Sequence, residues 1–113
     1  MSTPINFNNM QKRYLSVTLA DEKNTTLLIG TPTKAIMDDL ISLQNSINTY
    51  SENETNVDAF DAIYGACARV MSRNKAGVKI TKEQLEEILD YEDILIFFSA
   101  YLNFVSELKN QKN

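Results

Sequence analysis

Residues 14–29 read YLSVTLADEKNTTLLI, and this segment determines the class of fold that the chain can adopt. Polar and apolar residues alternate in its first six positions, which places Leu15, Val17 and Leu19 on one face of a strand. The turn-forming run DEKN follows, and TTLLI then supplies a second short strand. A lone hairpin is only marginally stable in water, so its apolar face must be covered by helices or by another chain's strands.

The four residues after the hairpin are expected to end it and to begin a helix. Thr31 can cap this helix, and Pro32 fits the first helical position, where no amide donor is needed. Apolar residues then recur at alternating spacings of four and three, which predicts a helix that reaches about residue 50. The predicted apolar seam comprises Ile36, Leu40, Leu43, Ile47 and Tyr50, widened by Met37 and Ile41.

A second helix is predicted to begin after the wholly polar residues 51–56 and to run to about Arg73. Thr55 followed by Asp58 has the pattern of a cap with an acid in the first turn. The sequence ends this helix with a basic last turn and a glycine stop at Gly77. Its predicted core face comprises Phe60, Ile63, Tyr64, Cys67, Val70 and Met71.

Two further helices are predicted in the C-terminal part of the chain. Thr81 and Gln84 stand at the spacing of a capping box, which favours a short helix that carries Leu85, Ile88 and Leu89. Asp90 is expected to end it and to cap the last helix. The apolar face of the last helix comprises Ile94, Phe97, Phe98, Tyr101, Phe104, Val105 and Leu108. Apolar surface also wraps a second side of this helix. The residues outside the main face are Leu95, Ile96 and Leu102.

These elements predict an α+β fold dominated by helices, in which an N-terminal β-hairpin packs on a bundle of about four helices. A chain of 113 residues fits one domain, so residues 1–113 are assigned to a single domain. Within it, we expect a flexible arm at 1–13, the hairpin at 14–29, the helical part at 31–108 and a polar tail at 109–113.

Charge and composition exclude several classes of partner. The net charge is −4 and the pI is about 4.7, and residues 51–113 hold the whole excess, with seven basic side chains against eleven acidic ones. Nucleic acids become poor partners, because their binding depends on clustered Lys and Arg. The sequence shows neither a signal peptide nor the apolar run of about 18–20 residues that spans a bilayer, so no membrane partner is expected. A single cysteine, Cys67, favours the cytoplasm.

The residue types that support common catalysis are missing or isolated. The chain has no histidine, which excludes a Ser-His-Asp or Cys-His arrangement and any histidine metal site. Cys67 lies on the predicted core face of the second helix, as free cysteines usually do. The three glycines are isolated, and the acids do not match a calcium loop. We therefore expect no catalytic residue, no cofactor and no metal, and a protein that is not an enzyme.

Six acids crowd one short stretch without an intervening base. They are Glu83, Glu86, Glu87, Asp90, Glu92 and Asp93. They can form a solvated helix face with acids near helix N-termini, they can dock a basic segment of a partner, or two of them can divide acid and base roles. The sequence leaves these three alternatives open, with catalysis the least favoured.

Three stretches of the sequence together carry a resemblance to a known family. The first is the hairpin, followed by Thr31-Pro32-Thr33-Lys34 and Met37-Asp38-Asp39-Leu40. The second is Ile80-Thr81-Lys82-Glu83-Gln84-Leu85, and the third is Ile88-Leu89-Asp90-Tyr91-Glu92-Asp93-Ile94-Leu95 leading to Phe98-Ser99-Ala100-Tyr101 and Phe104-Val105. In this order they resemble the small tail assembly chaperones of long-tailed phages and prophages of Gram-positive bacteria. The middle helix, residues 56–74, adds little to the match.

The resemblance implies a non-enzymatic protein of the host cytoplasm that binds the tape-measure protein. It would keep the apolar helices of this client soluble until tail-tube subunits polymerise around it, with the tail-tube protein as a second candidate partner. Self-association is compatible with this role, and the chain looks like the short form of a family that often also has a frameshift-extended form. The candidate partner-binding residues are Leu95, Ile96, Phe97, Phe98, Tyr101 and Leu102. Among them, the off-face Leu95, Ile96 and Leu102 are expected to touch the partner.

Two other non-enzymatic functions remain open. The chain can be an acidic regulator of a phage or mobile element that inhibits a host protein with the surface from Glu83 to Asp93, because acids at an interface steer a basic partner. It can also be a structural head–tail joining protein. An enzyme with a carboxylate pair is the last alternative.

Overall fold

The computed structural model describes residues 12–49 and 57–110 and has two antiparallel strands followed by four helices. Strand β1 (Leu15–Thr18) pairs with β2 (Thr26–Ile29), with Leu15 opposite Ile29 and Thr18 opposite Thr26. The helices are α1 (Lys34–Thr49), α2 (Val57–Met71), α3 (Lys82–Ile88) and α4 (Tyr91–Asn110). The predicted α+β fold, with an N-terminal hairpin and four helices, is confirmed.

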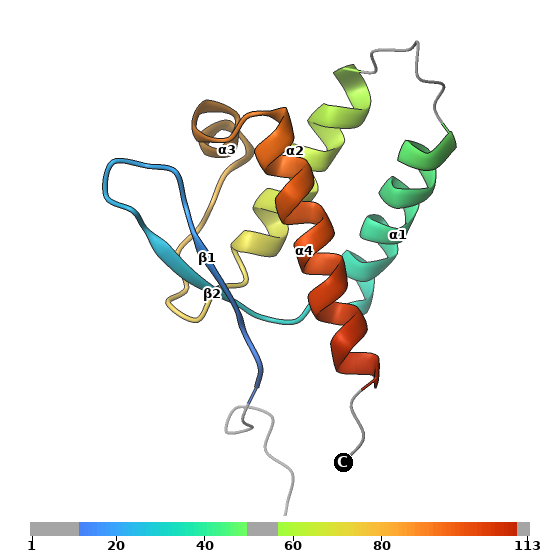
Figure 1. Cartoon of the computed structure of the whole chain (residues 1–113), viewed down its shortest axis with the longest axis horizontal. Helices are drawn as coiled ribbons and strands as arrows, with labels where there is room; N and C mark the ends of the chain where they lie inside the picture. Colours follow the sequence, from blue (N-terminus) through green and yellow to red (C-terminus); the bar gives the residue numbers. More distant parts are fainter. Residues whose placement is uncertain (1–11, 50–56, 111–113) are drawn as a thin grey trace, which may run out of the picture.

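Helix α2 is the central element of this arrangement. It packs against α1, α3, α4 and strand β2. The hairpin lies on one side of α2 and α4, and α1 lies on the other (Figure 1). An ion pair between Arg69 of α2 and Asp39 of α1 joins the two exposed edges of these helices. The hairpin is therefore covered on its apolar face by helices of its own chain.

The core follows the faces that the sequence predicted. Leu19, Leu27 and Ile29 are buried in the hairpin, while Leu15 and Val17 are half-buried against the core. On α2, Phe60 is half-buried and the other five predicted core residues are buried. On α4, Leu108 is half-buried and the other six residues of the predicted face are buried. Helical periodicity identified both faces because a helix repeats every 3.6 residues.

The turn between the strands is closed by the side chain of Asp21. Its carboxylate accepts hydrogen bonds from the Thr25 amide at 2.8 Å and from the Thr25 hydroxyl at 2.6 Å. These hydrogen bonds lower the pKa of Asp21, because they favour the ionised carboxylate. Asn24 adopts a positive φ of 52°, a conformation that asparagine tolerates better than most residues. The DEKN run therefore acts as the predicted turn.

Helix α1 begins two residues later than the sequence predicted. Thr33, and not Thr31, provides the cap, because its hydroxyl accepts a hydrogen bond from the Ile36 amide at 3.3 Å. Thr31 is held elsewhere: its carbonyl accepts a hydrogen bond from Arg73 Nε at 2.8 Å, and the Gly30 amide donates to the Arg73 carbonyl at 2.8 Å. Because Gly30 and Thr31 are engaged in these hydrogen bonds, helix α1 begins only after them, at Lys34.

The width of the apolar seam on α1 was also predicted wrongly. Leu40 is buried and Ile36, Met37 and Leu43 are half-buried, but Ile41 is 43% exposed. Helix α1 packs mainly against α2, so only a narrow stripe of α1 is covered. The side chains of Ile47, Tyr50 and Asp58, the predicted cap residue Thr55 and most of the arm at 1–13 lie outside what the structure describes.

The loop between α2 and α3 is bonded to the outer edge of β2. Asn74 is buried, and its Nδ2 donates to the carbonyls of Met71 at 2.8 Å and Val78 at 2.6 Å. The Asn74 backbone bridges to Ile29, and the Lys75 amide donates to the Leu28 carbonyl at 2.9 Å. Strand β2 therefore has neighbours on both edges.

The predicted ends of the helices hold in part. Helix α2 ends at Met71, so the predicted glycine stop at Gly77 lies in the following loop, where its φ is +74°. The capping box of Thr81 and Gln84 is confirmed at the start of α3. Helix α4 continues to Asn110, into the predicted polar tail.

The expected cap of α4 is confirmed as well. The Asp93 amide donates to Asp90 Oδ1 at 2.8 Å, and the Asp90 amide donates to Asp93 Oδ2 at 3.2 Å. The two acids thus satisfy each other's backbone donors at the start of the helix. In the part of the chain that the structure describes, neither α4 nor any other helix is long and apolar enough to cross a membrane.

Candidate functional site

The six candidate partner-binding residues on α4 divide between the core and the surface. Phe97, Phe98 and Tyr101 are buried, with exposed fractions of 7%, 5% and 1%. Leu102 is half-buried and packs against the core. The two exposed members are Leu95 at 36% and Ile96 at 61%. The apolar surface that α4 exposes therefore centres on Ile96 and Leu95, and the expected contact of a partner with Leu102 stays a prediction.

Two tyrosine hydroxyls fix the position of α4 and of its N-terminal connection. Tyr101 Oη donates to the Gly30 carbonyl at 2.8 Å, which ties the link between β2 and α1 to the helix. Burial raises the pKa of Tyr101 to about 12. Tyr64 Oη donates to the Leu89 carbonyl at 2.6 Å, and burial also raises the pKa of Tyr64. These two hydrogen bonds tie α4 and the segment before it to the rest of the fold.

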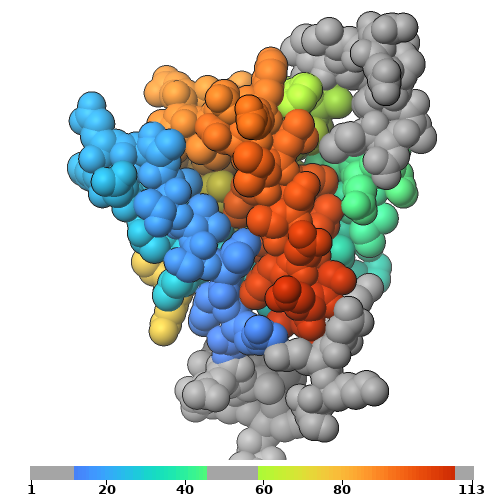
Figure 2. Space-filling model, viewed as in Figure 1, coloured from blue at the N-terminus to red at the C-terminus, as the bar shows by residue number. Residues whose placement is uncertain are grey.

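An open groove of about 300 Å³ lies between β1 and α4. Residues 16–20 form one wall, and Ile96, Phe97 and Ala100 lie on the other. Figure 2 shows β1 and α4 side by side on one face of the molecule. We call this hollow the β1–α4 groove. It brings the most exposed residue of the candidate set, Ile96, next to the edge of a strand.

A second open hollow lies where α2, α3 and α4 meet, with a volume of about 350 Å³. Its aromatic walls are Phe60, Tyr64 and Tyr91, and the Phe60 and Tyr91 rings stack at 4.2 Å between centroids. Tyr91 is 55% exposed. The carboxylates of Glu86 and Asp61 also line the hollow. We call it the acidic aromatic pocket.

The carboxylates of this region differ in their partners. Lys82 Nζ lies 2.5 Å from Asp61 Oδ1, and this hydrogen bond raises the pKa of Lys82. Asp90 and Asp93 are engaged in the cap of α4. The remaining acids of the stretch are exposed, and none has an ion pair with another described residue. They are Glu83, Glu86, Glu87 and Glu92. An exposed and solvated face is the arrangement that this geometry supports best.

Cys67 lies in the core and not in either hollow. It is 1% exposed, and burial raises the pKa of its thiol to about 12. A thiol in this state is a poor nucleophile, because the reactive species is the thiolate. Within residues 12–49 and 57–110, no group of three or more acidic, cysteine or histidine side chains is arranged to hold a metal ion.

Sequence reasoning placed the exposed apolar residues on α4 but missed the second wall of the groove. Strand β1 was predicted from its alternation of polar and apolar residues. This pattern shows which side chains share a face, but it does not show which element lies beside the edge of the strand. The available signal was the absence of charge between Tyr14 and Ala20. No family model matches the chain, and neither the curated proteins nor the solved structures gave a match.

Proposed function

We propose that the protein is a tail assembly chaperone of a long-tailed phage or prophage, which binds apolar helices of the tape-measure protein and keeps them soluble. The resemblance in the order of hairpin, helices and motifs motivates this function. The observation that carries it is Ile96, an isoleucine that is 61% exposed beside the β1–α4 groove. Leu95, on the same turn of α4, extends the apolar surface.

The physical basis of the proposed mechanism is reversible burial of apolar surface. Covering a side chain such as Ile96 with an apolar client helix stabilises the complex by about 1.5–3 kcal/mol, before the cost of association is subtracted. A few such contacts give a complex that forms readily and releases its client when a stronger partner competes. The exposed acids of α3 and α4 stand near this surface and keep the loaded complex soluble.

The decisive experiment coexpresses the chain with the tape-measure protein and measures the soluble fraction of the client. We expect Leu95→Ser combined with Ile96→Ser to lower that fraction severalfold, because both substitutions remove exposed apolar contacts. Leu102 is left unchanged, since it packs against the core and its replacement would disturb the fold. Ile41→Ser is the matched control, because Ile41 is a comparably exposed apolar residue on α1. An unchanged soluble fraction with the folded double variant contradicts the proposal.

The gene neighbourhood and the virion provide two independent observations. A chaperone of this kind is expected to have an overlapping reading frame at the 3′ end of its gene, followed by a very long open frame for the tape-measure protein. It is also expected to be absent from purified virions. A structural head–tail joining protein, in contrast, would be a component of the virion, so its detection there by mass spectrometry argues against the chaperone.

The acidic aromatic pocket supports a second candidate, the acidic regulator that binds a basic segment of a host protein. Glu86 has no ion pair among the described residues and lines a hollow with the exposed ring of Tyr91. Carboxylates and aromatic faces together attract Arg and Lys side chains. This reading requires that binding weakens steeply with salt, whereas apolar client binding does not.

A further inference from the structure

Strand β1 has a free edge, and the hydrogen-bonding pattern between β1 and β2 determines which backbone groups that edge presents. The Leu19 amide donates to the Thr25 carbonyl at 2.8 Å, so the odd-numbered residues of β1 direct their backbone groups toward β2. Ser16 and Thr18 therefore point their N–H and C=O groups away from β2. No described residue pairs with these outward groups. In contrast, β2 is bonded on both of its edges.

This edge lacks the charged residues, prolines and glycines that protect many edge strands from pairing. Residues 14–20 contain no charged residue, no proline and no glycine. Natural proteins usually place lysine, proline or a bulge on a free edge, because its unpaired groups recruit another strand. The β1–α4 groove lies beside this edge, with residues 16–20 in one of its walls. An unprotected edge next to an apolar groove is typical of a strand that pairs with a partner.

We propose that β1 pairs antiparallel with β1 of a second copy of this chain. The pairing is centred on Val17, so that Ser16 of each copy faces Thr18 of the other. Both of these residues carry outward backbone groups, so each facing pair exchanges two N–H to C=O hydrogen bonds. The resulting dimer has two-fold symmetry and a continuous four-stranded sheet, with β2 of each copy at the outer positions.

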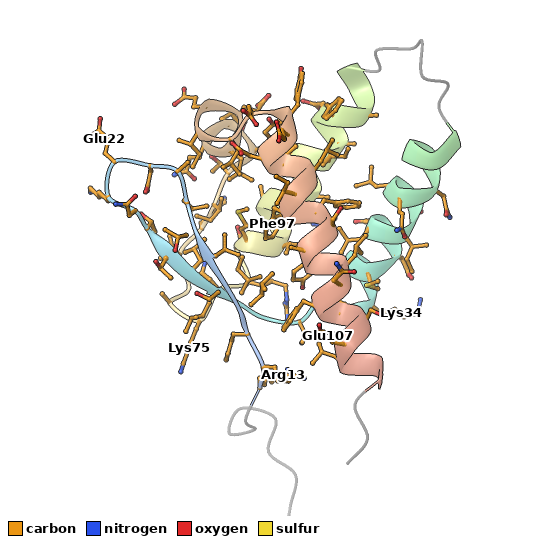
Figure 3. The ribbon with its side chains drawn as sticks, in the orientation of Figure 1. Arg13, Glu22, Lys34, Lys75, Phe97 and Glu107 are labelled. Atoms are coloured by element: carbon orange, nitrogen blue, oxygen red, sulfur yellow. The ribbon has the colours of Figure 1, made fainter. Side chains whose placement is uncertain are left out.

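Charge complementarity selects this register. Lys12 and Arg13 at the start of β1 come beside the turn of the other copy, which carries Asp21 and Glu22. Figure 3 shows Arg13 at the start of β1 and Glu22 in the turn beyond its other end. Lys12, Arg13 and Glu22 are exposed. A two-fold axis brings both ends together in this way, so basic and acidic residues meet at both ends of the new ladder.

The neighbouring symmetric registers lack this match. A pairing centred on Ser16 sets Arg13 opposite Leu19, and a pairing centred on Thr18 leaves Leu15 facing the turn that carries Asp21. Each places a charged residue against an apolar one. In the register centred on Val17, Leu15 faces Leu19, and apolar residues face each other on the core side. The inference stands independently of the chaperone role, because it rests on the strand edge and its flanking charges.

The first test measures the mass of the full chain in solution by sedimentation over a range of concentrations. We expect the wild type to be a dimer and Ser16→Pro to be a monomer. Proline at this position removes only an outward N–H, so the bonds to β2 remain and circular dichroism is unchanged. Thr26→Pro is the matched control, since the Thr26 amide also points away from the β1–β2 ladder but lies on β2. A monomeric wild type, or a dimeric Ser16→Pro variant, overturns the proposal.

The second test exchanges charges between the two ends of the strand. Lys12→Glu alone brings an acid beside the acidic turn in its own dimer, and Glu22→Lys alone brings a base beside Lys12 and Arg13. Each variant is expected to dimerise about three- to tenfold more weakly than the wild type. Mixing the two variants restores opposite charges, so a mixed dimer forms. If the mixture associates no better than its components, the register centred on Val17 is wrong.

Discussion

At the scale of single residues, one hydroxyl ties the link between the hairpin and the first helix to the last helix. Tyr101 is buried, and its hydroxyl is a donor to the Gly30 carbonyl. Tyr101→Phe removes the donor and leaves that buried carbonyl unsatisfied, so we expect the free energy of unfolding to fall by about 1–3 kcal/mol. Urea denaturation measures this change. Tyr91→Phe is the control, and because Tyr91 is 55% exposed it should alter stability by less than about 0.5 kcal/mol.

Cys67 gives a prediction about alkaline pH. Burial raises the pKa of its thiol from 9.0 to about 12, so the unfolded chain loses this proton near pH 9 while the folded protein keeps it. The raised pKa of Cys67 therefore makes its full contribution to the free energy of unfolding below pH 9. This contribution is lost as the pH rises from 9 to about 12. Within this range the loss is about 1.4 kcal/mol per pH unit.

Cys67→Ala isolates this effect, because the tyrosines and lysines that also titrate at high pH are the same in both proteins. We expect the free energy of unfolding of the wild type to fall more steeply than that of Cys67→Ala between pH 9 and about 12. Guanidinium denaturation at a series of pH values measures both slopes. Parallel slopes would mean that the thiol ionises as readily in the folded protein as in the unfolded chain.

The residues that the sequence predicted correctly are those whose environment follows from local periodicity. The buried faces of α2 and α4 were predicted because a helix repeats every few residues regardless of its neighbours. The cap of α1 was misplaced because Gly30 and Thr31 are held by Arg73, a contact across more than 40 positions that spacing cannot reveal. Ile41 was misplaced for a similar reason, since its exposure depends on how many helices cover α1.

At the scale of elements, the short helix α3 depends on its cap. It has only seven residues, too few for a stable isolated helix, and Thr81 and Gln84 satisfy each other's backbone groups at its start. We expect Thr81→Ala to lower the free energy of unfolding by about 1 kcal/mol and to speed amide exchange in α3. Gln84→Ala, which leaves the Thr81 hydroxyl in place, should cost less. Equal effects of the two substitutions would contradict this division of roles.

The elements themselves could be predicted from the sequence, but the surfaces between them could not. Alternation predicted β1 and the capping box predicted α3, because both signals are local. The β1–α4 groove depends on the packing of two elements about 75 positions apart. The acidic aromatic pocket depends on three helices, and only the exposure of Tyr91 shows that its ring remains available. The candidate residues of α4 were therefore named from the sequence, while the second wall of the groove beside them was not.

At the scale of the whole molecule, charge and apolar surface are unevenly distributed. The net charge of −4 comes from residues 51–113, and the exposed acids gather on α3 and the start of α4. The exposed apolar residues of α4 follow directly after them, with Leu95 and Ile96. A partner that approaches this end of the molecule meets carboxylates and apolar side chains within one or two helical turns. Salt separates the two contributions, because it screens charges and leaves apolar contacts almost unchanged.

The salt response of client binding therefore decides between the chaperone and the acidic regulator. We expect the retention of the tape-measure protein to change less than about twofold when salt rises from about 0.05 to about 0.5 M, because apolar burial carries the binding. Glu86→Gln combined with Glu87→Gln changes the net charge from −4 to −2 and should likewise leave retention intact. A pull-down across the salt series, with Leu95→Ser and Ile96→Ser alongside, measures both contributions. If salt releases the tape-measure protein steeply, and the two glutamine substitutions weaken retention as well, the acids carry the binding. That result would favour the acidic regulator over the chaperone.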